Sequence, residues 1–259
     1  MDVMSLLPEE LEALCKEMGQ PSYRAKQIFT FLSRGVPPME MTTLPKDFRQ
    51  ALTDRCEFRL PEIEEKQVSR LDGTIKYLFR LLDGECIESV FMRYEHGITI
   101  CISSQVGCRM GCRFCATARQ GLQHSLSTNE IINQIISIPE SERLTNLVFM
   151  GMGEPLDNID NVLRALQIIT ASWGMAWSPT RVTLSTAGVA RELERFLSES
   201  KVHLAVFRDD RHACDEVEGY LGLCHYEVDL AEVACRLKQI RNVWSEEFRE
   251  FQEYAYDLS

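Results

Sequence analysis

Three cysteines lie close together at Cys108, Cys112 and Cys115, in the spacing C-x3-C-x2-C. Thiolates from one loop can converge on a single metal centre. Zinc usually takes four ligands, most often as two separated pairs, so His124 or Cys101 would have to complete a zinc site. Iron–sulfur clusters are held by cysteine thiolates, and three of them leave one iron of a cube open to a small molecule. The spacing therefore favours an iron–sulfur cluster over zinc, and simple core packing of three thiols is favoured less still.

A second segment whose residues could take part in binding or catalysis is GMGEP, residues 151–155, which follows an apolar run. Gly151 and Gly153 permit close backbone approach, and the Glu154 carboxylate suits an ammonium group. A phosphate-binding loop is a rival interpretation, but the segment lacks a lysine and contains an acid and a proline. An ordinary turn between a strand and a helix is the other alternative.

The bulk properties describe an ordinary globular protein. The chain has 259 residues, of which 45% are hydrophobic and 26% are charged, enough for one large domain or two smaller ones. No apolar run reaches the length of a membrane span, and the acidic start of the sequence argues against a signal peptide. Ten cysteines without secretory context indicate a reducing, cytoplasmic location, where clustered thiols favour metal binding or catalysis over disulfides.

The acidic charge is unevenly distributed along the chain. The net charge is −11, which taken alone argues against a nucleic-acid partner. Residues 207–259 hold six Lys/Arg and thirteen Asp/Glu, a net of −7, which leaves −4 for residues 1–206. A nucleic-acid partner for the larger part therefore stays open.

The pattern of apolar residues changes twice along the chain. Residues 8–18 and 22–34 read as two helices, with Ser22 as a candidate N-cap and Gly35 as a candidate stop. Arg24, Lys26 and Arg34 give the second of them a basic side, for which a solvated face is the simpler interpretation. Short β-like runs follow between Lys66 and Tyr94, separated by the turn dipeptides Asp72-Gly73 and Asp83-Gly84, and they indicate a small meander.

From residue 98 onward, strand-like and helix-like runs alternate, which predicts βαβ units and a parallel sheet. After Phe207 the alternation stops, and apolar residues from Leu230 to Phe251 recur at steps of three and four, as in one amphipathic helix. The expected strands are 98–102, 147–150, 181–185 and 202–207, and the expected helices are 128–138, 159–172 and 189–199.

These motifs together resemble a known family. The three-cysteine spacing, with Phe114 just before the last cysteine, resembles the signature of the radical S-adenosylmethionine (SAM) superfamily. The wider runs SSQVGC, FCAT, FMGMGEPLDN and LSTAG resemble the RlmN/Cfr RNA methyltransferases, and RlmN more closely. The runs RAKQIF and IESVFMR are similar to that family as well. The resemblance covers about residues 1–206.

The resemblance implies a cofactor pair. Cys108, Cys112 and Cys115 would hold a [4Fe-4S] cluster whose open iron binds the amino and carboxylate groups of SAM. An electron donor such as flavodoxin or ferredoxin would supply the electron that splits SAM into a 5′-deoxyadenosyl radical. Gly153 and Glu154 would contact SAM.

Three further residues take roles only through the resemblance. Ser185, in LSTAG, matches another SAM-contacting position. Glu88 matches the proton acceptor of the family, and Cys101 matches the cysteine that resolves a covalent enzyme–RNA intermediate. Read without the family, Ser185 is a strand-end serine, Glu88 a surface acid and Cys101 a small apolar residue in a strand.

The implied activity is methylation of C2 of an adenosine in 23S rRNA and in tRNA, whereas Cfr-type enzymes modify C8. In this family a methyl-carrying cysteine lies near the C-terminus. A non-catalytic RNA- or protein-binding remnant and a radical SAM enzyme with another substrate are the alternatives.

The resemblance ends after VHLAV, where the family continues with SLH and this chain has FRD at 207–209. Nothing around Cys214, Cys224 or Cys235 matches the methyl-carrying cysteine, so a truncated, frame-shifted or divergent relative is expected. The expected fold class is α/β, an incomplete radical-SAM (βα) barrel preceded by a small helical domain and a β-meander. The expected parts are an RNA-binding-like helical domain (1–55), a meander extension (56–97), a partial barrel (98–206) and a divergent acidic helical tail (207–259).

Overall fold

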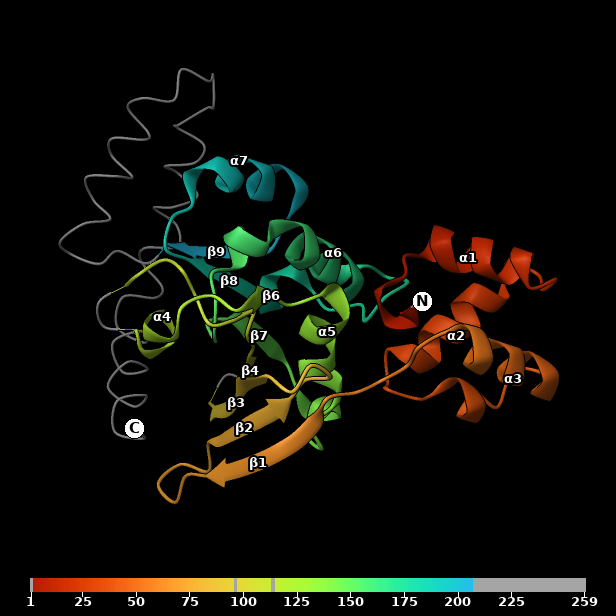
Figure 1. The fold of residues 1–259 in the computed structure, drawn as a ribbon, viewed down its shortest axis with the longest axis horizontal. Coiled ribbons are helices and arrows are strands. Elements are labelled where there is room, and N and C mark those ends of the chain that lie inside the picture. Colours follow the sequence, from red (N-terminus) through yellow and green to blue (C-terminus); the bar gives the residue numbers. More distant parts are fainter. Residues whose placement is uncertain (1, 96, 113–114, 207–259) are drawn as a thin grey trace.

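A computed structural model describes residues 2–95, 97–112 and 115–206 (Figure 1). The expected tail helix, Phe114 and the three tail cysteines lie outside these residues. The described chain is α/β, as the sequence predicts, and its central element is a seven-stranded sheet in the order β1-β2-β3-β4-β7-β8-β9. No helix in the described part is long and apolar enough to cross a membrane.

Three helices form the N-terminal part: α1 (Pro8–Glu17), α2 (Arg24–Leu32) and α3 (Lys46–Arg55). Single 3-10 turns at Val3–Ser5 and Pro38–Glu40 accompany them. Their apolar faces pack on one another because each helix repeats buried residues at steps of three and four. These buried residues include Leu11, Leu14, Ile28, Leu32, Phe48 and Leu52.

The expected N-cap at Ser22 is wrong. Tyr23 occupies the N-cap position of α2, and no side chain caps the helix. Tyr23 has helical dihedral angles, and the Arg24 amide donates to the Pro21 carbonyl at 3.0 Å. The chain thus enters α2 through a helical turn, whereas a capping side chain needs extended backbone at its own position.

The meander is present where the turn dipeptides predict it. Strands β1 (Glu62–Val68), β2 (Ile75–Arg80) and β3 (Cys86–Tyr94) pair antiparallel in sequence. Asp72 accepts a hydrogen bond from the Thr74 amide at 3.0 Å, and Asp83 accepts one from the Glu85 amide at 3.0 Å. These side-chain bonds replace the ladder bonds that the backbone loses in each turn.

The parallel part consists of β4 (Gly97–Cys101), β7 (Asn146–Phe149), β8 (Val182–Thr186) and β9 (His203–Val206). Between these strands run α5 (Thr128–Ile136), α6 (Ile159–Thr170) and α7 (Ala190–Glu199). All four strands and all three helices fall where the sequence predicts them. Smaller elements are α4 (Ala116–Gln120), a β5–β6 pair (Gln105–Val106 with His124–Ser125) and 3-10 turns at Ser141–Arg143, Pro155–Asn158 and Pro179–Arg181.

The meander and the parallel strands form one continuous sheet because β3 pairs antiparallel with β4. One face of this sheet packs into the main hydrophobic core together with α5, α6 and α7. The strand residues of that face include Phe91, Ile100, Leu147, Phe149, Leu184 and Leu204, and the helix residues include Ile131, Ile135, Val162, Leu166 and Phe196.

The N-terminal helices contact α6 and the segment that follows it through polar and aromatic side chains. Arg164 donates from Nε to the Ser5 carbonyl at 2.7 Å and forms an ion pair with Glu10. Phe29 of α2 meets Trp173 edge to face, with ring centroids 5.2 Å apart. Figure 1 shows α1–α3 gathered at one side of the molecule and α4 at the other. Helix α4 follows the segment 108–115, called the cysteine loop below.

Candidate functional site

Segments that follow three parallel strands meet at the carboxyl edge of the sheet. The segment after β4 (102–108) binds the segment after β7 (150–158) along their backbones. The Gly151 amide donates to the Ile102 carbonyl at 3.1 Å, and the Ser104 amide donates to the Met152 carbonyl at 2.8 Å. In parallel sheets this edge is where functional side chains gather.

The glycines of GMGEP are required by packing between these two segments. A Cβ at Gly151 would lie 2.7 Å from the Ile102 carbonyl oxygen. A Cβ at Gly153, whose φ is +98°, would lie 2.5 Å from the Cβ of Gln105. The close backbone approach expected from the sequence is therefore present, and it lies between the GMGEP segment and the segment after β4.

Glu154 is buried at the centre of this edge, with 3% of its surface exposed. Its Oε1 accepts hydrogen bonds from the Thr186 hydroxyl at 2.6 Å and from the Leu156 amide at 3.0 Å, and its Oε2 accepts one from the Ala187 amide at 2.8 Å. Burial raises the pKa of this carboxyl, although the three hydrogen bonds oppose the shift. No Lys or Arg of the described residues forms an ion pair with it. A cationic group would supply the missing charge, and Oε2 retains room for another donor.

The cysteine loop begins within electrostatic range of this carboxylate. Cys108 is buried, and Cys112 and Cys115 are half-buried. Burial raises the pKa of the Cys108 thiol. Negative charge on Cys115, on Glu154 and on Cys112 acts in the same direction, so these groups lie within electrostatic range of it.

The loop offers three thiols and contains no histidine or carboxylate that would compete with them. The kind and number of these ligands fit a [4Fe-4S] cluster in which one iron has no protein ligand. The Cys115 amide donates to the Cys112 carbonyl at 3.2 Å, which makes a tight turn between these two ligands. Across the described residues, however, no three Cys, His, Asp or Glu side chains are gathered around one point as metal ligands. The donors are thus of the right kind and in one loop, and their convergence would accompany binding.

Glu88, Cys101 and Ser185 share the face of the sheet that is turned away from the main core. Cys101 of β4 lies opposite Val90 of β3, and Glu88 is two residues from Val90. Cys101 is also aligned with Val148 of β7, which is aligned with Thr183, two residues from Ser185. Because side chains alternate along a strand, residues in register or two apart point to the same side. The sheet therefore brings these three sequence-predicted residues to one face.

Their surroundings differ. The Glu88 side chain is 41% exposed and forms an ion pair with Lys76 at 2.7 Å. Cys101 is buried against Met92 and Val148, and burial raises the pKa of its thiol to about 12. Ser185 is half-buried.

A set of buried polar side chains joins these elements, and the sequence did not single it out. Ser103 donates from Oγ to the Glu88 carbonyl at 2.7 Å and accepts from the Met152 amide at 2.9 Å. Gln134 of α5 donates to the Ser103 carbonyl at 2.9 Å and accepts from the Ser103 amide at 2.8 Å. The only signal in the sequence is that polar residues continue directly after the apolar strand. Other members include Ser89, Ser104, Gln105, Asn158 and Thr186.

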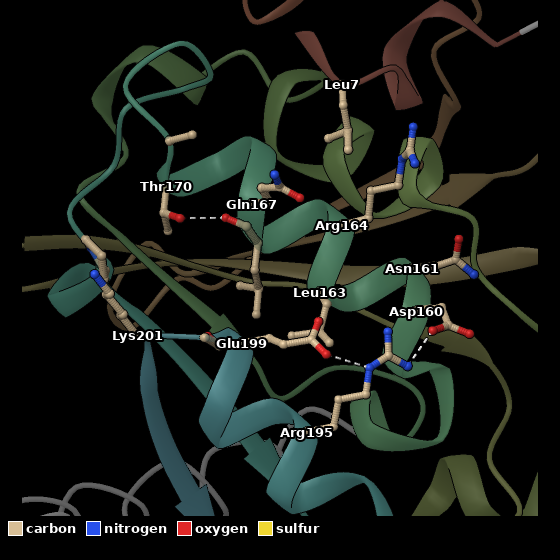
Figure 2. A pocket seen from close by; sticks show the side chains of 14 residues that line it. Leu7, Asp160, Asn161, Leu163, Arg164, Gln167, Thr170, Arg195, Glu199 and Lys201 are labelled. Atoms are coloured by element: carbon tan, nitrogen blue, oxygen red, sulfur yellow. Dashed lines mark hydrogen bonds and ion pairs between the residues drawn. The ribbon is translucent and has the colours of Figure 1, made fainter. Parts of the chain in front are cut away.

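A cavity of about 730 Å³ lies elsewhere, on the outer side of α6 (Figure 2). Figure 2 shows Arg195 of α7 between Asp160 and Glu199, with which it forms ion pairs. None of the site residues predicted from the sequence lines this cavity.

The parallel sheet carries three cysteines after its first parallel strand and a buried glutamate after the next. The class of proteins with this arrangement is the radical SAM superfamily, whose family model matches residues 102–207. A crystal structure of a radical SAM methyltransferase from Sphaerobacter thermophilus superimposes with a TM-score of 0.74 at 39% identity, over 80% of this chain and 63% of that one. The likeness at this identity extends to sequence as well as fold.

Curated relatives narrow the class. Proteins named "Probable dual-specificity RNA methyltransferase RlmN" are 46% identical over 199 residues in Bacteroides fragilis and 48% identical over 200 residues in Phocaeicola vulgatus. Each match covers 76% of this chain, and 58% and 57% of those relatives. The chain thus spans somewhat less than three fifths of their length. It belongs to the RlmN-like family of the radical SAM superfamily.

Proposed function

We propose that this chain is a radical SAM RNA methyltransferase of the RlmN type, which methylates C2 of adenosine in 23S rRNA and tRNA. The observation that carries the proposal is the buried Glu154 carboxylate, which has no cationic partner among the described residues and lies in electrostatic range of Cys108. The amino-acid part of SAM satisfies both features, because its amino group can donate a hydrogen bond to Glu154 while its amino and carboxylate groups chelate a cluster on the cysteine loop. The names of the relatives support RNA as substrate.

The cofactor-binding roles follow from this arrangement. Cys108, Cys112 and Cys115 would hold a [4Fe-4S] cluster, which supplies the electron for reductive cleavage of SAM. Glu154 would accept a hydrogen bond from the SAM amino group at Oε2, where, among the described residues, the Ala187 amide donates. Gly153 would keep this carboxylate in place through its packing on the segment after β4.

The remaining roles belong to the face of the sheet away from the main core. Ser185 would contact SAM from the end of β8. Glu88 would take the proton that leaves adenine C2, and its exposed carboxylate is already paired with Lys76. Cys101 would release the product by attacking the sulfur of the methyl-carrying cysteine, which forms a disulfide between the two cysteines and breaks the bond from that sulfur to the product carbon. Burial raises the pKa of the Cys101 thiol, which keeps it protonated and less reactive.

The wider assignments are also proposals. Residues 1–55 would contact RNA, with Lys26 of α2 and Arg34 just after this helix among the basic residues, and residues 56–97 would extend the sheet of the partial barrel (98–206). A flavodoxin or ferredoxin would donate the electron. The protein would act in the cytoplasm, where its RNA substrates are.

The deciding experiment is complementation of a strain that lacks its own adenine-C2 methyltransferase. The expected result is 2-methyladenosine in digested RNA with the wild-type chain, and none with Cys112→Ala or Glu88→Gln. Cys86→Ala is the matched control because Cys86 is a half-buried cysteine outside the loop. SAM cleavage by the purified chain without 2-methyladenosine would instead indicate another substrate. Binding of RNA without SAM cleavage would indicate a non-catalytic role.

A further inference from the structure

The cysteine loop and the GMGEP turn are tied together by one carboxylate, Asp157. Its side chain is 9% exposed. Its Oδ1 accepts from Arg109 Nε at 3.1 Å, and the same oxygen forms an ion pair with the Arg109 guanidinium. Its Oδ2 accepts from Gln105 Nε2 at 2.9 Å. Asp157 therefore contacts the residue that directly follows Cys108 and a residue of the segment after β4.

Gln105 continues the connection to the proposed SAM site. It is fully buried, and its Oε1 accepts from the Glu154 amide at 2.9 Å. Its Nε2 also donates to the Ser125 hydroxyl at 3.1 Å. A chain of contacts thus runs from Arg109 through Asp157 and Gln105 to the backbone of Glu154.

The charges favour this arrangement. Burial opposes ionisation of Asp157, but the hydrogen bonds from Arg109 and Gln105 and the Arg109 charge outweigh it, and its pKa is lowered. The pKa of Arg109 is raised by the same contact. Asp157 is therefore a carboxylate, and hydrogen bonds to a charged group with little exposure are stronger than neutral ones.

We propose that Asp157 is a positioning residue that fixes the Cys108 end of the cysteine loop against the Glu154 turn. The proposal rests on the proposed function, because the spacing between the cysteine loop and the Glu154 turn matters only if both segments bind SAM. The amino and carboxylate groups of SAM are attached to one carbon, so the cluster loop and Glu154 must lie within the reach of one amino-acid group. A displacement of about 1 Å at such a site lowers the rate strongly.

The test begins with the chain without cluster, so that it does not depend on activity. Amide hydrogen exchange of residues 106–112 is compared in wild type, Asp157→Ala, Asp157→Asn and Arg109→Ala. Exchange should accelerate about tenfold or more in Asp157→Ala and Arg109→Ala, the size expected for loss of a charge-assisted hydrogen bond. Asp157→Asn should lie between them and wild type, because an amide keeps the shape and one acceptor.

Asp160→Ala is the matched control. Asp160 lies three residues after Asp157 in the chain and is 81% exposed. It forms an ion pair with Arg195 at the cavity along α6, away from the cysteine loop (Figure 2). Its exchange in residues 106–112 should equal wild type. If Asp157→Ala does not fold, the Arg109→Ala and Asp157→Asn arms decide, since Arg109 is 62% exposed and tolerates substitution.

The second readout uses the reconstituted chain. Asp157→Ala should bind as much iron as wild type but raise the KM for SAM by about tenfold. Arg109→Lys should raise the KM for SAM less than Arg109→Ala does, because lysine retains the charge. Wild-type exchange in residues 106–112 of Asp157→Ala and Arg109→Ala would overturn the proposal. If the wild-type chain failed to cleave SAM, the proposed function would fail, while the exchange comparison would still decide whether Asp157 holds the loop.

Discussion

Substitution of Gly153 by alanine tests the central geometric feature of the site, the close packing of GMGEP on the segment after β4. Two penalties combine at this position. The φ of +98° is strained for any residue with a side chain, and the new Cβ would lie 2.5 Å from the Gln105 Cβ and 2.7 Å from its amide nitrogen. The first penalty costs about 1–2 kcal/mol, and the second about 1–3 kcal/mol as overpacking.

Two other glycines of this chain separate the penalties. Gly84, in the β2–β3 turn, has a φ of +91° and open space around its Cβ position, so Gly84→Ala carries strain alone. Gly151 lies outside the left-handed region, and its Cβ would meet the Ile102 carbonyl oxygen at 2.7 Å, so Gly151→Ala carries overlap alone. We expect losses in unfolding free energy of about 1 kcal/mol for Gly84→Ala, about 1–3 for Gly151→Ala, and about 2–5 for Gly153→Ala.

The assay is equilibrium unfolding in urea of the three variants and wild type, without cluster. A loss for Gly153→Ala no larger than that for Gly84→Ala would refute the reasoning, because it would mean that the Gln105 contact is not tight. The reconstituted Gly153→Ala chain should also bind SAM more weakly than wild type, since the Glu154 turn must shift to accommodate the methyl group. Gly84→Ala should bind SAM as wild type does.

Two more predictions concern the ionisable groups. Cys101 keeps its proton to a pKa of about 12 in the folded chain, above the ordinary 9.0, so its stabilising contribution is complete below about pH 9 and is lost as the pH rises toward 12. Urea unfolding at about pH 9 and pH 10 should therefore show wild type losing about 1 kcal/mol more than Cys101→Val; equal losses would contradict the burial of the thiol. Glu154→Gln should weaken SAM binding by about tenfold or more, measured by anaerobic equilibrium dialysis, because the SAM amino group loses a charged hydrogen-bond acceptor. An unchanged affinity would remove Glu154 from the proposed SAM site.

Much of the fold is readable in the sequence because its signals are local. Asp72-Gly73 and Asp83-Gly84 mark the meander turns, and each aspartate makes its stabilising bond only two residues away. The parallel strands read as continuous apolar runs because most of their side chains are buried on both faces, as in β4, β7 and β8. Glu88 and Cys101 were reached through resemblance alone, since a surface acid and a strand cysteine carry no local sign of function.

The buried polar network could not be predicted, because its bonds join residues far apart in the chain. Ser103 meets Gln134 and Met152, and Gln105 meets Glu154 and Asp157; each pair is 31 to 52 residues apart. The cap at Ser22 failed for a related reason. Residue type suggests a cap, but the backbone entering the helix decides whether the hydroxyl can reach an amide.

The alternation along β4 has a consequence for how this gene can vary. Cys101 and Glu88 face the same way only because Cys101 lies opposite Val90. A codon gained or lost within Gly97–Cys101 that slipped the strand by one position would turn the thiol toward the helices and present Ile100 in its place. Insertions and deletions there should thus be purged even when they leave every residue of the site intact.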